Sequence, residues 1–126
     1  MSLSTATQER VKVLIVDDND DQLHLLRRHF EIAGCDVTVA ATAESAISAY
    51  GTVELDLAVI DLMLPGMDGW ELSERFYADV PGCPVAISSV LDLESYPPSR
   101  TALPKPVTRA SVREVLLSCV PRWIAP

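Results

Sequence analysis

The sequence has few basic residues, no long apolar run and no paired cysteines. Among 126 residues, 10 Lys and Arg stand against 18 Asp and Glu, which gives a formal net charge of −8 at pH 7. A nucleic-acid surface needs clustered Lys and Arg, so we expect no direct nucleic-acid binding. The longest uncharged stretch, Val80 to Leu91, is interrupted by Pro and Ser. It is shorter than the roughly 20 apolar residues of a membrane span, so we expect no membrane insertion.

Cysteine usage and chain length indicate a single domain in a reducing compartment. Cys35, Cys83 and Cys119 are widely spaced and include no Cys-x-x-Cys pair, which favours neither a disulfide framework nor a zinc site. The N-terminus has no apolar core of a signal peptide, so we expect a cytoplasmic location. We expect a disordered segment at 1–10, beginning with residues that resemble an expression scar, one domain at 11–120 and a C-terminal tail at 121–126.

Short apolar runs alternate with segments of helical periodicity. Val11–Val16 and Leu57–Ile60 are nearly continuous apolar runs, typical of strands buried on both faces. Apolar residues recur at i, i+3, i+4 and i+7 over Ala43–Tyr50 and Val112–Cys119, which predicts helices. Strands that alternate with helices on short connections predict an α/β fold with a parallel sheet covered on both faces. The remaining predicted elements are strands at Val37–Val39 and Val85–Ser88 and helices around Leu23–Ala33 and Trp70–Phe76.

The segment from Leu91 to Leu103 is the poorly patterned part of the chain. It contains Pro97-Pro98 and lacks an amphipathic period, so the helix between strands four and five is predicted to be short or missing. A weak fifth strand is predicted just before Lys105. Because this strand would contain Pro104, it must lie at the edge of the sheet, where a missing amide is tolerated.

Acidic residues follow two of the predicted strands directly. Asp17 and Asp18 come after the first strand and Asp61 comes after the third. Ligands of an open parallel sheet bind outside the carboxyl ends of its strands, so these carboxylates converge if the two strands are neighbours. Carboxylates this close favour a bound cation, and Mg²⁺ is the cation that suits them. Lys105, held between two prolines, is a second candidate for a cation that faces this site.

These residues resemble the receiver domain of two-component response regulators, over essentially the whole chain from Val11 to about Val120. The resemblance is carried by Asp17-Asp18, the run Asp61–Gly69, Ser89 and Lys105-Pro106, all in order at strand ends. It implies a flavodoxin-like, doubly wound, five-stranded parallel sheet of order 2-1-3-4-5.

The resemblance also implies a role for each site residue. Asp61 would accept a phosphoryl group from a sensor histidine kinase or a phosphotransfer protein. Mg²⁺ would be held by Asp18, Asp61 and the backbone carbonyl of Met63, with Asp17 acting largely through water.

The other two residues would serve the phosphoryl group itself. The hydroxyl of Ser89 would bond a phosphoryl oxygen, and Lys105 would pair with the acids and then with the phosphate. The Lys105-Pro106 bond is typically cis in this family. Such a domain is a signalling switch that turns over no separate substrate and acts on a downstream output domain or protein; a homodimer is left open.

Three features depart from the family pattern. Ala102 stands where the family has a switch aromatic, and Val90 follows Ser89 where the family has Ala or Gly. The bulkier Val90 predicts slow phosphorylation by small donors. The short connection from Ser89 to Lys105 predicts an altered signalling face.

Two alternatives compete with the receiver interpretation. One is a pseudo-receiver, an interaction module that keeps the fold without phosphorylation, and the altered signalling face keeps it open. The other is a phosphatase of the haloacid dehalogenase type, which needs a second acid two residues after the nucleophile. Met63 occupies that position, which disfavours a phosphatase.

Overall fold

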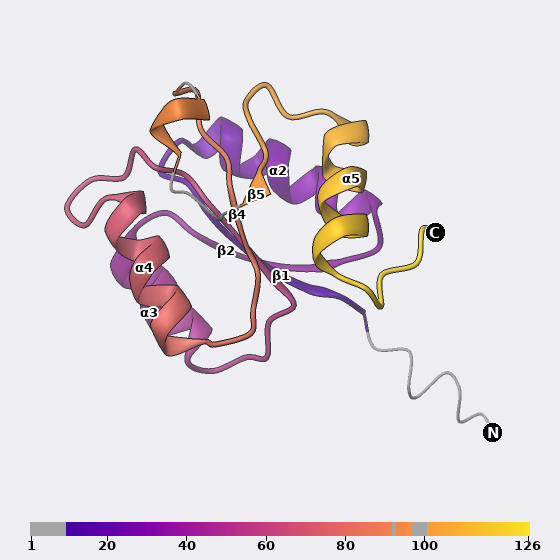
Figure 1. The fold of residues 1–126 in the computed structure, drawn as a ribbon, viewed down its shortest axis with the longest axis horizontal. Helices are drawn as coiled ribbons and strands as arrows, with labels where there is room; N and C mark the ends of the chain where they lie inside the picture. Colours follow the sequence, from indigo (N-terminus) through magenta and orange to yellow (C-terminus); the bar gives the residue numbers. More distant parts are fainter. Residues whose placement is uncertain (1–9, 92, 97–100) are drawn as a thin grey trace.

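The computed structural model describes residues 10–91, 93–96 and 101–126. Pro97-Pro98 and all but Arg10 of the predicted disordered segment lie outside the described residues. Strands and helices alternate, as the periodicity predicts (Figure 1). The strands are β1 (Lys12–Val16), β2 (Asp36–Ala40), β3 (Leu57–Ile60), β4 (Val85–Ile87) and β5 (Thr101–Ala102), and the helices are α2 (Asp20–Ile32), α3 (Ala43–Tyr50), α4 (Gly69–Asp79) and α5 (Arg109–Cys119).

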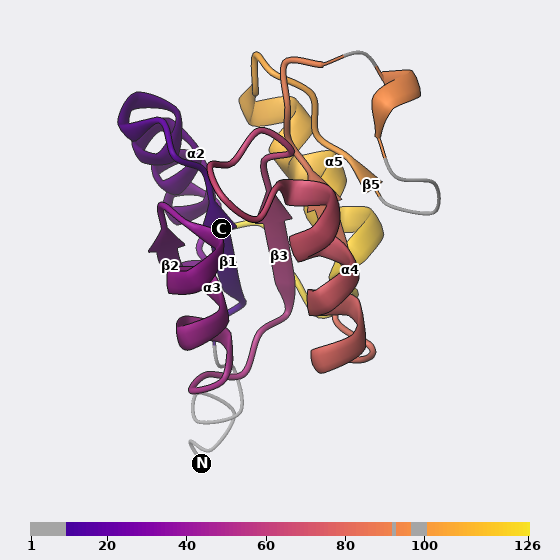
Figure 2. The ribbon, with the colours of Figure 1, turned by 90° about the vertical axis from the view of Figure 1, so that its left-hand side faces the viewer.

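The five strands form one parallel sheet in the order β2-β1-β3-β4-β5, which confirms the predicted fold. Helices α2 and α5 cover one face and helices α3 and α4 cover the other, as Figures 1 and 2 show together. The register pairs Val16 of β1 with Ile60 of β3, so these two neighbouring strands end at the same level.

The pleat of the central strands divides the core between the two faces. Val13 and Ile15 pack into the cluster under α2 and α5, whereas Leu14 and Val16 pack into the cluster under α3 and α4. Successive side chains point to opposite faces and both faces are covered, so β1 is apolar from Val13 to Val16, and its one charged residue, Lys12, stands partly exposed at the start of the strand. The continuous apolar run in the sequence follows directly from this burial.

Each helix begins at a residue whose side chain accepts a backbone N–H of the first turn. Asp20 and Asp21 lie in that turn of α2, where acids interact favourably with the helix N-terminus. No helix in the described part of the chain combines the length and the apolar character needed to cross a bilayer. The capping residues are Asn19, Thr42, Asp68 and Thr108.

The connection from β4 to β5 contains a single turn of 3-10 helix, η1 (Leu93–Ser95), among its described residues. This confirms the prediction of a short or missing helix. The prediction that Pro104 lies within the fifth strand is wrong, because β5 ends at Ala102. Backbone bonds to β4 nevertheless continue from Leu103 N–H to the Ile87 carbonyl (2.7 Å) and from Lys105 N–H to the Ser89 carbonyl (3.1 Å). Since alternate residues face β4, the amide that proline lacks would point away from the sheet.

Candidate functional site

The ends of β1 and β3 bring Asp17 and Asp61 together inside the protein. Asp17 follows Val13 and Ile15 at the two-residue spacing of the pleat, and Asp61 follows the equivalent positions of β3. The Asp61 N–H donates to the Val16 carbonyl at 2.9 Å, which continues the ladder between the strands. Asp17 is 0% exposed and Asp61 is 6% exposed. Two carboxylates are rarely buried side by side without a cation to compensate them.

Lys105 supplies a positive charge between the two aspartates. Its Nζ donates to Asp17 Oδ2 at 2.6 Å and to Asp61 Oδ2 at 3.2 Å. Burial by itself would lower the pKa of Lys105, but the hydrogen bond to Asp17 and the charges of both aspartates outweigh burial and raise that pKa above its ordinary value. Lys105 is therefore a permanent cation in this site. The Lys105-Pro106 peptide bond is cis, in agreement with the prediction.

The second oxygen of each aspartate is held by a backbone amide two residues further along. Asn19 N–H donates to Asp17 Oδ1 at 2.9 Å, and Met63 N–H donates to Asp61 Oδ1 at 3.1 Å. Each carboxylate thus uses one oxygen for its own loop and the other for Lys105. The loop after β3 is also packed closely, because a Cβ added to Gly69 would stand 2.0 Å from the Asp61 carbonyl oxygen. Only glycine fits there.

Asp18 is exposed but belongs to the same cluster of carboxylates. One carboxylate oxygen from each of Asp17, Asp18 and Asp61 lies within 4.8 Å of the others. With Lys105 as the near cation, three carboxylates share one positive charge, so the cluster keeps an excess of negative charge. Hard oxygen donors in a negatively charged, partly open site fit Mg²⁺, which binds through one or two carboxylates and keeps several waters.

Ser89 lies at the end of β4 and is fully buried. Its carbonyl oxygen accepts the backbone N–H of Lys105 at 3.1 Å, which ties it to the residue that contacts Asp61. Its Oγ accepts the N–H of Leu91 at 3.3 Å. Val90 is 71% exposed, and the prediction that it slows small phosphoryl donors stays a prediction.

Tyr96 is a residue at this site that the sequence analysis missed. Its hydroxyl contacts the backbone of Ser89 on both sides, at 3.0 Å from the N–H and 2.9 Å from the carbonyl oxygen. Tyr96 falls in the poorly patterned segment after β4, where no periodicity or motif marks a residue. Its contact depends on how that segment folds back onto the sheet.

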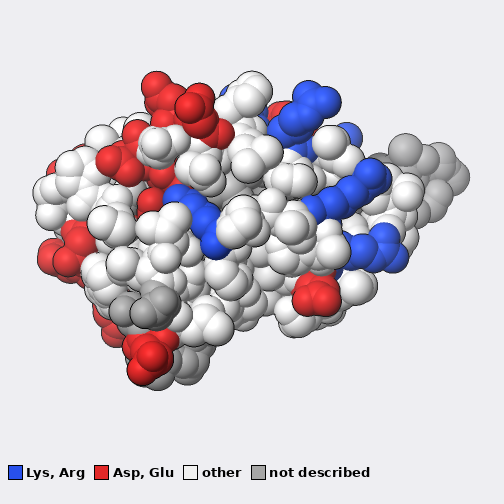
Figure 3. Space-filling view, turned by 90° about the horizontal axis from the view of Figure 1, so that it is seen from above, with Lys and Arg blue, Asp and Glu red and all other residues white. Residues whose placement is uncertain are grey.

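Figure 3 looks onto the end of the molecule where the strands finish. Acidic surface gathers on the side of α3 and α4, and basic surface gathers on the side of α5. The molecule is acidic overall, and in this view most of the acidic surface lies on one side and most of the basic surface on the other.

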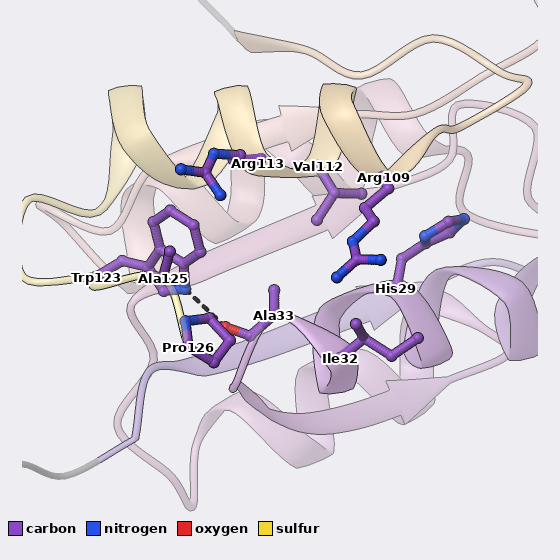
Figure 4. A pocket seen from close by; sticks show the side chains of 9 residues that line it. All are labelled: His29, Ile32, Ala33, Arg109, Val112, Arg113, Trp123, Ala125 and Pro126. Carbon is purple, nitrogen blue, oxygen red and sulfur yellow. Dashed lines mark hydrogen bonds between the residues drawn. The ribbon is translucent and has the colours of Figure 1, made fainter.

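A separate pocket lies between α2 and α5 and contains no carboxylate side chain. Figure 4 shows Arg109 and Arg113 beside it, with Trp123 at one end. Trp123 Nε1 donates to the Ala33 carbonyl at 2.8 Å, and the indole is buried in the cluster under α2 and α5. The predicted tail at 121–126 therefore contributes a core side chain. A pocket lined by two arginines disfavours a metal cation, whereas the carboxylates of Asp17, Asp18 and Asp61 form a candidate metal site.

Comparison with known proteins identifies one family and several relatives that resemble this chain. The family model of the "Response regulator receiver domain" matches residues 13–97. The chain is 44% identical to the heme response regulator HssR of Staphylococcus haemolyticus over 69 residues, which cover 55% of this chain and 31% of that protein. It is 39% identical to the alkaline phosphatase synthesis transcriptional regulatory protein PhoP of Bacillus subtilis over 64 residues, 51% of this chain and 27% of that protein. The chain spans less than a third of these relatives.

A solved structure supports the same assignment across most of the fold. A CheY-like response regulator receiver domain protein from Methanospirillum hungatei superposes with a TM-score of 0.79 at 28% identity. The superposition covers 87% of this chain and 93% of that one. It extends beyond the segment matched by the family model and the two curated relatives.

Proposed function

Because this chain belongs to the response regulator receiver domain family, which serves two-component signalling, we propose that it accepts a phosphoryl group on Asp61 from a histidine kinase in a Mg²⁺-dependent reaction. Phosphorylation would then change the surface that the domain presents to an output domain or protein. The observation that carries the proposal is the buried arrangement of Asp17 and Asp61 around the Lys105 amine.

The proposed reaction depends on charge more than on covalent catalysis by the protein. A carboxylate oxygen of Asp61 forms a bond to phosphorus as the P–N bond of the donor phosphohistidine breaks, and the electron pair of that bond returns to the imidazole. The product is an acyl phosphate. Asp61 is suited to this step because Met63 N–H and Lys105 Nζ fix the orientation of its carboxylate.

Other residues would bind the transferred group. Lys105 would move from the carboxylates toward a phosphoryl oxygen, and the Ser89 hydroxyl would donate to another. Asp18, Asp61 and the Met63 carbonyl would hold Mg²⁺, with Asp17 acting largely through water. The ion would supply positive charge that neutralises the phosphoryl oxygens.

The decisive test removes the acceptor and leaves the fold intact. Beryllofluoride with Mg²⁺, a mimic of an aspartyl phosphate, should bind the wild-type protein, and the Asp61→Asn variant should lose this binding by more than about a hundredfold. Titration followed by ¹⁹F NMR measures both affinities. Asp36→Asn, which removes an exposed carboxylate at the opposite end of the sheet, is the matched control and should bind as the wild type does. Retained binding in Asp61→Asn would show that Asp61 is not the acceptor.

The pseudo-receiver remains the second candidate because of one feature. Ala102 on β5 is exposed and β5 is only two residues long, so the edge of the sheet offers no aromatic side chain at the usual switch position. Phosphate-affinity electrophoresis after incubation with histidine kinases separates the two functions. A shifted band that Asp61→Asn abolishes supports the receiver, whereas no shifted band with any kinase that phosphorylates a control receiver supports the pseudo-receiver.

A further inference from the structure

The hydroxyl of Tyr96 forms hydrogen bonds with both backbone polar groups of the buried Ser89. It accepts the N–H of Ser89 at 3.0 Å and donates to the carbonyl oxygen of Ser89 at 2.9 Å. Ser89 is fully buried, so no solvent replaces these bonds. A residue held at its N–H and its carbonyl oxygen cannot turn its backbone, and the direction of its side chain is fixed with it.

The Tyr96 hydroxyl takes the place of a backbone carbonyl that a longer β5 would offer to the Ser89 N–H. Leu103 N–H donates to the Ile87 carbonyl and Lys105 N–H donates to the Ser89 carbonyl, as in a parallel ladder. In such a ladder the Ser89 N–H between them would donate to the carbonyl of Leu103. Here that N–H donates to Tyr96 instead. Tyr96 thus replaces one hydrogen bond of the parallel ladder beyond Ala102, where β5 is too short to pair further with the segment after β4.

The surroundings of Tyr96 keep its hydroxyl in place and protonated. The ring packs against the apolar cluster under α3 and α4. Burial raises the pKa of Tyr96, the hydrogen bond with Ser89 opposes this, and the charge of Asp61 raises it further. The net pKa lies above the ordinary value, so the hydroxyl remains a donor at physiological pH.

We propose that Tyr96 is a positioning residue for the phosphoacceptor site: by holding the Ser89 peptide, its hydroxyl presents the Ser89 hydroxyl to the phosphoryl group on Asp61. The inference rests on the proposed function and adds to it a residue from the segment after β4. Ser89 Oγ already accepts the Leu91 N–H, which leaves its proton free to donate. An oriented donor binds more tightly than one that must first be ordered.

The first test deletes only the hydroxyl. Tyr96→Phe should weaken binding of beryllofluoride in saturating Mg²⁺ by about threefold to tenfold, the value of one oriented hydrogen bond, and should leave the affinity for Mg²⁺ alone unchanged. Tyr50→Phe is the matched control: it removes a tyrosine hydroxyl that bonds Asp79 between α3 and α4, and should leave both affinities unchanged. Equal beryllofluoride affinities in Tyr96→Phe and the wild type would overturn the inference while the proposed function stands; no binding by the wild type would overturn the proposed function itself.

The second test asks whether Tyr96 acts through Ser89. Ser89→Ala should weaken beryllofluoride binding by about tenfold, and the double variant Ser89→Ala/Tyr96→Phe should bind no more weakly than Ser89→Ala alone. Additive losses would show that Tyr96 acts by another route. Hydrogen exchange at the Ser89 amide, measured without Mg²⁺ or beryllofluoride, should accelerate in Tyr96→Phe and not in Tyr50→Phe. Unchanged exchange would mean that the hydroxyl does not hold this peptide in solution.

Discussion

At each end of the sheet, an aspartate and a cation join segments that lie far apart in the sequence. At the carboxyl ends of the strands, Lys105 bonds Asp17 and Asp61, 88 and 44 residues away. At the amino ends, Arg122 makes two bonds to Asp56, 66 residues away, of which the shorter is 2.7 Å. The two regions use the same chemistry, but they differ in burial and in charge balance.

The ion pair at the amino ends of the strands is balanced in charge and half exposed to solvent. Arg122 is 44% exposed and Asp56 is 26% exposed, and one carboxylate faces one guanidinium. Asp56 also accepts the Lys12 N–H at 2.8 Å, so it joins the start of β1 to the segment that follows α5. Arg122 also donates to the carbonyl oxygen of Arg10 at 3.0 Å. This ion pair joins the start of β1 to the segment after α5, and its two opposite charges cancel, so the pair carries no net charge that would attract a ligand.

The carboxyl-end cluster is buried and unbalanced. Lys105, Asp17 and Asp61 have almost no exposed side-chain surface, and Asp18 adds a further negative charge beside them. Stability alone would favour fewer charges here, since burying ions costs more than their attraction commonly returns. An excess of negative charge that the fold maintains against this cost indicates binding rather than structural support. Three predictions test this difference between the carboxyl-end cluster and the amino-end ion pair.

Replacing the buried cation should have the largest effect on stability. Lys105→Met leaves Asp17 and Asp61 buried without compensation, so we expect a loss of about 3–5 kcal/mol in the free energy of unfolding. Urea denaturation measures this loss. Adding Mg²⁺ should stabilise the variant more than the wild type, because the variant cluster has the larger uncompensated charge.

The control for this substitution is the same change at the other end of β1. Lys12→Met should alter the free energy of unfolding by no more than about 0.5 kcal/mol. A Lys105→Met protein as stable as Lys12→Met would contradict the buried, charge-coupled cluster.

Breaking the amino-end pair should have a smaller effect that depends on pH. Arg122→Met should cost about 1 kcal/mol at neutral pH, since its partners are partly screened by solvent. Burial by itself would raise the pKa of Asp56, but the bonds from Arg122 and from Lys12 N–H outweigh it and lower that pKa below 3.8. A carboxyl whose pKa is lower in the folded state stabilises the protein above its unfolded pKa and ceases to do so as pH falls through the folded value.

The stability difference between the wild type and Arg122→Met should therefore shrink as the pH falls from the unfolded-state pKa of Asp56 through its lower folded-state pKa, where Asp56 becomes protonated. Denaturation curves at several pH values measure it. Arg27→Met, which removes an exposed helical pair with Glu31, is the control and should cost no more than about 0.5 kcal/mol. A difference that grows toward acid would contradict the lowered pKa of Asp56.

The sequence predicted the central strands and the acidic residues for one shared reason. β1 and β3 are buried on both faces, so their apolar runs are continuous and end sharply at the first polar residue. Asp17 and Asp61 are those residues, and the parallel register places them side by side. The strand order itself came from the family resemblance, since no local pattern distinguishes neighbours in a parallel sheet.

The edge of the sheet was predicted less well, because its contacts are not local. β5 pairs through only two residues, and its bonding continues past Ala102 in an irregular segment that has no strand periodicity. Tyr96 contacts Ser89 from the residue just after a one-turn helix, and Trp123 fills a core position from a segment predicted to be a tail. Such contacts depend on the tertiary path of the chain, which short-range patterns do not encode.

Removing one surplus carboxylate should have the smallest effect on stability and separates binding from folding most cleanly. Asp18 is exposed and stands beside two other carboxylates, so Asp18→Asn relieves repulsion and should change the free energy of unfolding by no more than about 0.5 kcal/mol, in the stabilising direction. The same change should weaken Mg²⁺ binding by more than about tenfold, because it removes an oxygen donor with its charge.

Asp21→Asn is the control for this last prediction, since Asp21 lies in the first turn of α2 outside the carboxylate cluster. It should leave Mg²⁺ affinity unchanged and lose a few tenths of a kcal/mol of favourable interaction with the helix N-terminus. Calorimetric Mg²⁺ titration and urea denaturation of both variants compare the two aspartates directly. If Asp18→Asn binds Mg²⁺ as the wild type does, Asp18 is ordinary acidic surface, and the excess charge at the carboxyl end must be assigned to Asp17 and Asp61 alone.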